Sequence, residues 1–239
     1  MPPKPVISVV IPAYNEERVL AICLQHVNQA VARAGVPCEV IVSDNNSTDR
    51  TPEIAKSFGA TVVRTTEKGY VHAAIVGIHA ARGEIIAMTD SDTRVPPSWL
   101  NKIHAAYQRD PELVGVGGGF EFYDGHELIR WLVRVLNRIS FRFTIATMVG
   151  MNMSFKKDAY LAVGGHDPQI NTQADTYLGL QLSKHGKITL LPDITVDASG
   201  RRYASLWRAF TETVMRLLNV LWLRLFDRVL VENFVDIRQ

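Results

Sequence analysis

The sequence has little of several features that would decide its class at once. Only two of its 239 residues are cysteines, Cys23 and Cys38, and their spacing fits no metal-binding motif. We expect both thiols to be reduced, which favours a cytoplasmic protein. The best candidate for a membrane span, residues 217–223, is closed off by Arg216 and Arg224 and is far shorter than the roughly 20 residues that a spanning helix needs. The chain opens on Pro-Pro-Lys-Pro, and we expect no signal peptide because no long apolar segment follows.

Neither sign of charge dominates. Lysine and arginine number 26 and the acidic residues 24, and the net charge of +2 is too small to indicate a nucleic-acid partner by itself. A hydrophobic content of 47% predicts a folded chain and excludes a disordered one. A chain of this length can bury a sizeable core, and the simplest arrangement is one α/β domain with an appendage.

The first hundred residues alternate strand-like and helix-like patterns, which is typical of successive βαβ units. The predicted strands lie at residues 6–11, 39–42, 61–63 and 85–88, and the predicted helices at residues 16–34, 50–58 and 71–81. Further along, we expect helices at residues 99–107 and 172–185 and strands at residues 113–120, 150–155 and 188–191. We therefore predict one domain over residues 1–202 and a C-terminal amphipathic helical appendage over residues 203–239.

The triplet Asp90-Ser91-Asp92 carries the clearest chemical signal. It follows the apolar run at residues 85–88, so a buried strand would end there and present two carboxylates on a loop. Two close carboxylates repel each other unless a cation or hydrogen-bond donors offset their charge. Hard ions such as Mg²⁺ and Mn²⁺ suit oxygen ligands and commonly bridge a carboxylate to phosphates. Alone the triplet is weak evidence, because most such motifs are solvated turns.

Polar segments also follow the first two predicted strands. The first runs from Pro12 through Tyr14 to Glu16, and the second from Asp44 to Asp49. In a parallel sheet these loops and the Asp90 loop converge on one edge, where open α/β sheets bind ligands. A base, a ribose and a diphosphate would fit across them.

The order and spacing of these segments resemble the family 2 glycosyltransferases, which have the GT-A fold. The resemblance rests on VVIPAYNEE, SDNNSTDRT, EKGYVHAAIVGIHAARGEIIAMTDSD and GMNMSFKKDAYLAVGGHD followed by ADTYLGLQLSKHGKI, and covers residues 6–191. It implies an α/β fold with a mixed, mostly parallel sheet flanked by helices. It also implies a nucleoside-diphosphate sugar as donor, such as a UDP- or GDP-sugar, and transfer of the sugar with inversion.

The resemblance implies roles for individual residues. The donor-binding set is Pro12, Ala13, Tyr14, Glu16, Asp44, Asn46, Lys68, Asp90, Ser91, Arg201 and Arg202. Asp44 would accept a hydrogen bond from the base, although it also suits helix capping, as Asp49 does more strongly. Lys68 precedes Gly69 at a helix start, where it suits a phosphate or sugar or is an exposed turn lysine.

The metal and the base are implied in the same way. Asp92, with Asp90 beside it, would hold Mg²⁺ or Mn²⁺ against the departing diphosphate. Asp175 would be the general base that takes the acceptor's proton, or else a first-turn helix charge. Arg201 and Arg202 would clamp the diphosphate from a Gly-hinged loop, or would be solvated surface arginines.

Three positions depart from the family pattern. Ala174 precedes Asp175 where the family usually has Glu, which leaves open how the acceptor is oriented. Asn45 replaces an acid, and Asn46 suits a left-handed turn that Gly would otherwise supply. His166 follows Gly-Gly in place of an aromatic residue, and it would be either an acceptor contact or a half-buried structural histidine.

Two stretches read as basic amphipathic helices. In the first, four arginines recur every four residues beside an apolar stripe: Arg130, Arg134, Arg138 and Arg142. The second lies in the appendage, and its apolar face includes Leu206 and Phe210. Such helices with Trp131 and Trp222 suit a membrane interface, and hence a lipid-linked acceptor, but they equally suit packing on the sheet or a homodimer contact. Binding of these helices to a membrane interface would place the protein on the cytoplasmic face of a membrane.

Other classes fit less well. A dinucleotide dehydrogenase would need Gly-x-Gly-x-x-Gly after the first strand, and a dehalogenase-like phosphatase would carry Asp-x-Asp there. A nucleotidyltransferase would need an early Gly-rich basic loop, which is absent. A non-catalytic nucleotide-sugar-binding or scaffold protein remains the alternative from another class.

Overall fold

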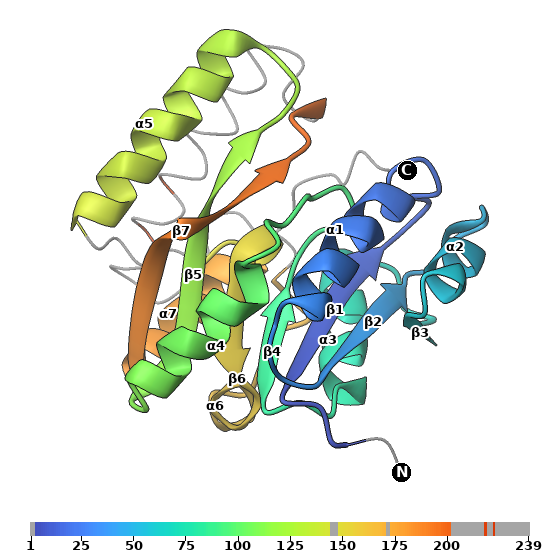
Figure 1. Cartoon of the computed structure of the whole chain (residues 1–239), viewed down its shortest axis with the longest axis horizontal. Coiled ribbons are helices and arrows are strands. Elements are labelled where there is room, and N and C mark those ends of the chain that lie inside the picture. The colour runs from blue at the N-terminus through green and yellow to red at the C-terminus, as the bar shows by residue number, and fades with distance from the viewer. Residues whose placement is uncertain (1–2, 144–147, 171–172, 202–217, 219–221, 223–239) are drawn as a thin grey trace.

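A seven-stranded sheet forms the centre of the computed structural model, with helices on both faces (Figure 1). The structure describes residues 3–143, 148–170, 173–201, 218 and 222. The strands are β1 (Ile7–Ala13), β2 (Cys38–Asp44), β3 (Thr61–Arg64), β4 (Ile85–Met88), β5 (Leu113–Phe122), β6 (Met153–Lys156) and β7 (Lys187–Ala198). The helices are α1 (Leu20–Ala32), α2 (Thr51–Ser57), α3 (Tyr70–Ala80), α4 (Trp99–Arg109), α5 (Glu127–Phe143), α6 (Lys157–Ala162) and α7 (Ala174–His185), and a 3-10 turn spans Gly150–Asn152.

The strand order is β3-β2-β1-β4-β6-β5-β7. Only β6 runs antiparallel to its neighbours, so the sheet is mixed and mostly parallel, as predicted. The chain moves from β1 to β2 on one side and places β4 on the other. Such a reversal of strand order opens a crevice at the carboxyl ends of the strands. The antiparallel β6 begins at this same edge, because Met153 pairs with Met88 at the end of β4.

Two hydrophobic layers hold the sheet between the helices. On one face, α1 and α4 contribute Leu24 and Trp99, both fully buried, to a large cluster. On the other, α3, α6 and α7 bury Ile78, Tyr160 and Leu178 against the sheet. Burial on both faces explains why the central strands are near-continuous apolar runs.

The first strand is longer than predicted. We expected Pro12 to end it, but β1 continues to Ala13 and Pro12 pairs with Ser43 of β2. Pro12 is tolerated because β4 already ends opposite Val10, so no partner on that side needs its missing N–H. The helix that follows begins at Leu20 rather than Glu16. The backbone carbonyl of Glu16 accepts hydrogen bonds from the N–H groups of Val19 and Leu20, which form a turn before the helix.

The second half departs further from expectation. The predicted strand at residues 150–155 is a 3-10 turn followed by β6, and the short helix α6 was not predicted. The last strand continues past Pro192 to Ala198. Pro192 lies where the register with β5 skips from Leu191 to Val196, so it has no paired residue in β5 and costs no ladder hydrogen bond. The predicted appendage at residues 203–239 lies outside the described residues except for two isolated positions. In the described part of the chain, no helix has the length and apolarity to cross a membrane.

Candidate active site at the carboxyl edge of the sheet

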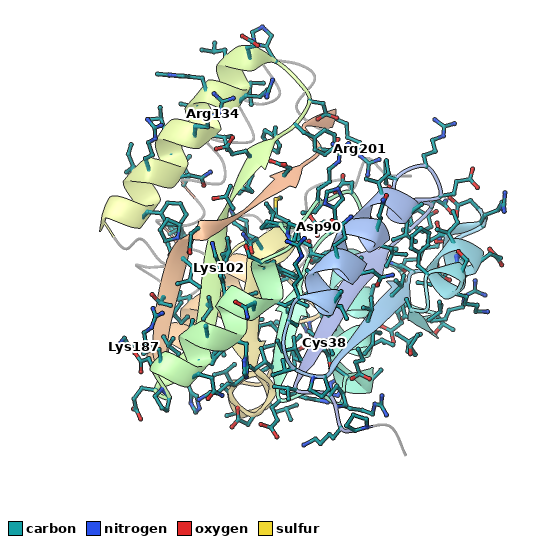
Figure 2. All side chains as sticks on the ribbon, viewed as in Figure 1. Cys38, Asp90, Lys102, Arg134, Lys187 and Arg201 are labelled. Carbon is teal, nitrogen blue, oxygen red and sulfur yellow. The ribbon has the colours of Figure 1, made fainter. Side chains whose placement is uncertain are left out.

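The loops after β1, β2 and β4 meet at one edge of the sheet, as the sequence predicts. These strands are adjacent and parallel, and they end at Ala13, Asp44 and Met88. Figure 2 shows Asp90 and Arg201 in the same part of the molecule, whereas Lys187 lies at the far end of β7. The edge therefore brings together residues that are more than a hundred positions apart in sequence.

The first two loops are tied together by hydrogen bonds. The backbone N–H of Asn15 donates to the Ser47 hydroxyl at 3.0 Å, and that of Glu16 donates to the buried Thr51 hydroxyl at 2.8 Å. The Asn15 side chain accepts from the Thr48 N–H at 2.8 Å. Asn15 has a left-handed backbone with φ of 52°, which its short polar side chain permits. The loop after β1 and the loop after β2 thus form one connected wall at this edge of the sheet.

Asp49 has the structural role that its Ser-Thr-Asp context predicts. Its carboxylate accepts from the N–H and hydroxyl of Thr51 at the start of α2, and from the Glu17 N–H. Partial burial opposes ionisation of this carboxyl, but these hydrogen bonds outweigh it and lower its pKa.

Asp44 is fully buried and already engaged. One carboxylate oxygen accepts from the Ser47 N–H at 3.0 Å, and the other pairs with Arg64 Nε at 2.7 Å. Ser47 lies in the loop before α2, which begins at Thr51, so Asp44 does not cap that helix. Its carboxylate holds the loop instead and forms an ion pair that was not predicted. Each oxygen keeps a second lone pair, which can accept one further hydrogen bond, such as one from a base N–H. The neighbouring Asn46 has φ of 62°, the left-handed turn predicted for it.

The other predicted nucleotide contacts differ in exposure. Pro12 and Ala13 are buried in the wall, whereas Tyr14 is partly exposed. Lys68 is exposed just before Gly69, whose φ of 124° turns the chain into α3. Lys68 therefore stands at a helix start on the carboxyl edge, where an anion would meet exposed N–H groups.

The loop that carries Asp90 is held in place by hydrogen bonds to backbone carbonyls. Ser91 is buried, the Asp90 carbonyl accepts from the Thr93 N–H at 3.1 Å, and Thr89 donates to the Met151 carbonyl at 3.0 Å. The Cys23 thiol lies 3.4 Å from the Asp90 carbonyl. Burial, reinforced by the charges of Asp92 and Asp90, raises the pKa of Cys23 far above its ordinary range, so this free thiol stays neutral.

Arg201 contacts the Asp90 loop through Asp92 and also binds Glu16. Its guanidinium lies 2.7 and 2.9 Å from the two carboxylate oxygens of Glu16 and 3.0 Å from Asp92. Glu16 is almost fully buried, Asp92 is 18% exposed and Arg201 is 47% exposed. Burial opposes the charge on Arg201, but the Glu16 hydrogen bonds and the charge of Asp92 raise its pKa. The structure thus places Arg201 in the predicted site, as a partner of two predicted site residues. Arg202 lies outside the described residues.

The end of β7 carries Arg201 to Asp92. Arg94 and Asp197 form an isolated antiparallel bridge, with N–H to carbonyl distances of 2.7 and 3.0 Å. Asp124 accepts from the Ser199 hydroxyl and from the Gly200 N–H, which fixes the turn just before Arg201. The backbone bridge between Arg94 and Asp197 therefore joins the loop that bears Asp90 and Asp92 to the segment that bears Arg201.

The residues present fit a hard divalent ion. Among the described residues, no three or more His, Cys, Asp or Glu side chains are grouped to hold a metal by themselves. Asp92 and Asp90 would supply carboxylate oxygens, and Mg²⁺ or Mn²⁺ normally completes its shell with water and substrate phosphates. The Asp92 carboxylate already faces a cation, the Arg201 guanidinium, which shows that positive charge is favoured there.

Asp175 lies in the first turn of α7, but its carboxylate has specific partners. His166 Nε2 lies 3.1 Å from Asp175 Oδ1, and the Tyr70 hydroxyl lies 3.4 Å from the same oxygen. Tyr70 is the first residue of α3, and Gly150 approaches so closely that a Cβ there would lie 2.2 Å from Asp175 Oδ2. Asp175 is therefore held at the carboxyl edge, close to the start of β6. His166 is fully buried rather than half-buried.

Several site residues were not predicted from the sequence. Thr51 and Tyr70 lie within strings that carry the family resemblance, but the sequence assigned neither a role. Arg64 lies in a strand with no distinguishing motif. Asn152 is a buried hub that accepts from Trp99 Nε1 and donates to the carbonyls of Gly119 and Ile194. Only its place in Gly-Met-Asn-Met-Ser, among apolar neighbours, is a signal that a buried polar group would stand there.

Comparison with known proteins gives the family directly. Residues 8–163 match the family model described as Glycosyl transferase family 2. Asp175, His166 and Arg201 lie beyond the matched residues, so their assignment depends on the geometry above.

Curated relatives are glycosyltransferases. The chain is 44% identical over 88 residues to the low-salt glycan biosynthesis hexosyltransferase Agl6 of Haloferax volcanii, covering 37% of this chain and 21% of the relative. It is 25% identical over 188 residues to the glucosyl-dolichyl phosphate glucuronosyltransferase of the same organism, covering 72% of this chain and 59% of the relative. Both matches span less than two thirds of the relatives' own length.

Solved structures share the fold. The mannosyltransferase PcManGT from Pyrobaculum calidifontis, in complex with GDP-Man and Mn²⁺, aligns with a TM-score of 0.68 at 21% identity, covering 89% of this chain and 65% of that one. The glucosyl-3-phosphoglycerate synthase from Mycobacterium tuberculosis, in complex with Mn²⁺, UDP and glucosyl-3-phosphoglycerate, aligns with a TM-score of 0.65 at 19% identity, covering 92% and 80%. The predicted GT-A fold is confirmed. The chain belongs to glycosyl transferase family 2.

Proposed function

We propose that this chain transfers a sugar from a nucleoside-diphosphate sugar to an acceptor hydroxyl, with inversion at the anomeric carbon and dependence on Mg²⁺ or Mn²⁺. One observation carries the proposal. The carboxyl edge of the sheet bears Asp92 paired with a guanidinium at 3.0 Å, and also a separate, oriented carboxylate, Asp175. Inverting transfer needs these two functions, one for the leaving diphosphate and one for the acceptor's proton.

The donor would lie across the first two loops. The nucleotide would contact the part of this wall made by Pro12, Ala13, Tyr14 and Glu16. Asp44 would accept a hydrogen bond from the base. Asp90 and Ser91 would lie near the ribose. Similar proteins solved with GDP-Man or with UDP support a nucleotide-sugar donor of this class.

The leaving group would be stabilised by positive charge. Mg²⁺ or Mn²⁺, when held by Asp92 and Asp90, supplies charge neutralisation on the diphosphate. Arg201 is already within reach of Asp92, so its guanidinium would bind diphosphate oxygens from the other side. Mn²⁺ in the similar structures supports the metal assignment.

Asp175 would be the general base. As the acceptor oxygen bonds to the anomeric carbon, Asp175 takes the hydroxyl proton. The bond from that carbon to the diphosphate breaks, and its electron pair leaves with the diphosphate. The sugar is thereby inverted and nucleoside diphosphate is released.

A panel of UDP- and GDP-sugars tests the proposal. Full-length protein is screened by thermal shift with Mn²⁺ and with EDTA, and nucleoside diphosphate release is then measured for each donor that binds. We expect metal-dependent stabilisation and turnover with one donor class, and loss of metal-dependent binding in Asp92→Ala. Binding without turnover across the panel would favour the non-catalytic scaffold. Release of pyrophosphate from a sugar phosphate and a nucleoside triphosphate would indicate a nucleotidyltransferase.

A membrane surface is the proposed location of the acceptor, and α5 supports it. Leu128 and Trp131 on this helix are 56% and 57% exposed, and Leu132 and Ile139 continue the same face. Two arginines of the basic stripe contact the sheet, the alternative left open from the sequence: Arg130 donates to the Phe122 carbonyl and Arg134 pairs with Glu121 of β5. Figure 2 shows α5 with Arg134 at one side of the molecule. We therefore propose that an apolar face, more than a basic one, contacts lipid near a lipid-linked acceptor.

A further inference from the structure

Asp175 and His166 form a buried pair at the acceptor side of the site. His166 Nε2 lies 3.1 Å from Asp175 Oδ1. The imidazole is 0% exposed and the Asp175 side chain is 19% exposed. A fully buried ring therefore contacts a carboxylate that solvent, and hence an acceptor, can reach.

The opposite side of the imidazole is fixed by Tyr160. The Tyr160 hydroxyl lies 3.3 Å from His166 Nδ1 and also accepts from the His166 backbone N–H at 3.2 Å. Burial, with the charge of Asp175 adding to it, raises the pKa of Tyr160, so the phenol keeps its proton. A neutral imidazole carries one N–H, so a phenol proton directed to Nδ1 would leave that N–H on Nε2, which faces Asp175.

The loop geometry locks this arrangement. Gly165 has φ of 72°, and a Cβ there would lie 2.7 Å from the Tyr160 ring. Tyr160 is stacked on Phe155 of β6 with ring centroids 5.1 Å apart. These contacts hold Tyr160 in place, and with it the imidazole of His166 beside Asp175.

The neighbouring departure from the family pattern is explained by the same geometry. Ala174 replaces the usual Glu, and it is buried with Val71 and Ile170 in a small apolar cluster. It therefore offers no polar group to the acceptor. Among the described residues, His166 and Tyr70 have side chains within hydrogen-bond distance of the Asp175 carboxylate.

We propose that His166 is a positioning residue for Asp175. By donating Nε2–H to Oδ1 it fixes the carboxylate plane and leaves Oδ2 to take the acceptor's proton. Among the described residues, no hydrogen bond is made to Oδ2. This inference rests on the proposed transfer function, because it assigns the residue that orients the base.

Two substitutions in the full-length protein test the role. His166→Phe keeps a ring against Tyr160 but removes the donor, whereas His166→Gln retains a side-chain N–H near the Nε2 position. We expect His166→Phe to lower kcat about 10- to 100-fold while the donor KM stays within about twofold, and His166→Gln to recover to within about fivefold of wild type. Thermal unfolding of each variant shows whether it is folded.

The outcomes separate the two proposals. Wild-type kcat in His166→Phe, or equal loss of kcat in the Phe and Gln variants, overturns the positioning role while the transfer function stands. If His166→Phe does not fold, Tyr160→Phe carries the test, because it keeps the ring and removes the hydroxyl that contacts both Nδ1 and the backbone N–H of His166. A lower kcat at unchanged donor KM then supports the role and an unchanged kcat overturns it. A wild-type protein that turns over no donor overturns the proposed function, and this inference with it.

Discussion

Arg201 balances two carboxylates at the candidate site. Glu16 is almost fully buried, and its two oxygens are both bound by this guanidinium. Asp92 shares the same cation at 3.0 Å. A buried carboxylate without a partner is costly, so Arg201 contributes to the stability of the loop as well as to binding.

Replacing Arg201 should therefore affect both properties. Arg201→Ala leaves Glu16 buried without its donor, and we expect a loss of about 1–2 kcal/mol in the free energy of unfolding, limited by the half-exposed position of the arginine. We also expect donor affinity to fall because a diphosphate contact is lost. Urea denaturation and donor titration measure the two effects. Unchanged stability would mean that Glu16 is satisfied in another way.

Gly150 sets the space around the base. A Cβ at this position would lie 2.2 Å from Asp175 Oδ2 and 2.4 Å from the Tyr70 hydroxyl. We expect Gly150→Ala to displace the carboxylate and reduce transfer by about 10-fold or more, with donor affinity retained. Steady-state kinetics and donor titration check this.

Gly59→Ala is the matched control for that substitution. It adds the same methyl group in open space at a φ of 81°, so it should cost about 1 kcal/mol of stability and leave transfer unchanged. Equal losses of transfer in the two variants would show that general destabilisation, rather than contact with Asp175, explains the effect.

At the scale of elements, the strand ends position the predicted site residues, and hydrogen bonds between loops hold the loops in place. The ends of β1, β2 and β4 supply the predicted residues, and hydrogen bonds from Asn15 and Glu16 join the first two loops. The bridge between Arg94 and Asp197 joins the third loop to the end of β7. The site is therefore supported by loop-to-loop contacts that no single element contains.

Helix α5 is the element for which the membrane proposal is tested. Leu128→Glu places a charge at the N-terminal end of the exposed apolar face of α5, and we expect it to weaken co-sedimentation with anionic liposomes several-fold. Leu161→Glu is the matched control, because Leu161 is 52% exposed on α6 and should leave lipid binding unchanged. No lipid binding by the wild-type protein would contradict the proposal, and a concentration-dependent dimer lost in Leu128→Glu would identify this face as a homodimer contact.

At the scale of the whole molecule, the sequence predicts the parallel half of the sheet well. Apolar runs before Asp44 and Asp90 mark buried strands, and the order of strands and helices places both residues on one edge. The strand through Pro12 was mispredicted because its tolerance depends on where β4 ends, which is a tertiary fact. The 3-10 turn before β6 and the helix α6 also lack a distinct periodicity.

The predicted site is recovered unevenly for a related reason. Asp90, Asp92 and Asp44 follow strands, so local pattern is enough to place them. The pairing of Arg201 with Glu16 joins residues 185 positions apart, and the contact of Tyr70 with Asp175 joins residues 105 apart. Such contacts are determined by the packing of the whole chain, and no periodicity of the sequence reports them.

The most direct test of the account compares the wild-type protein with Asp175→Asn, using the donor identified by the panel and Mn²⁺. Donor affinity and nucleoside diphosphate release with an acceptor are measured on the same samples, and the anomeric configuration of the product is read by NMR. We predict an inverted product from the wild type, and equal donor affinity with transfer reduced at least about 100-fold in Asp175→Asn. Near-normal transfer by Asp175→Asn, or a product with retained configuration, would contradict it.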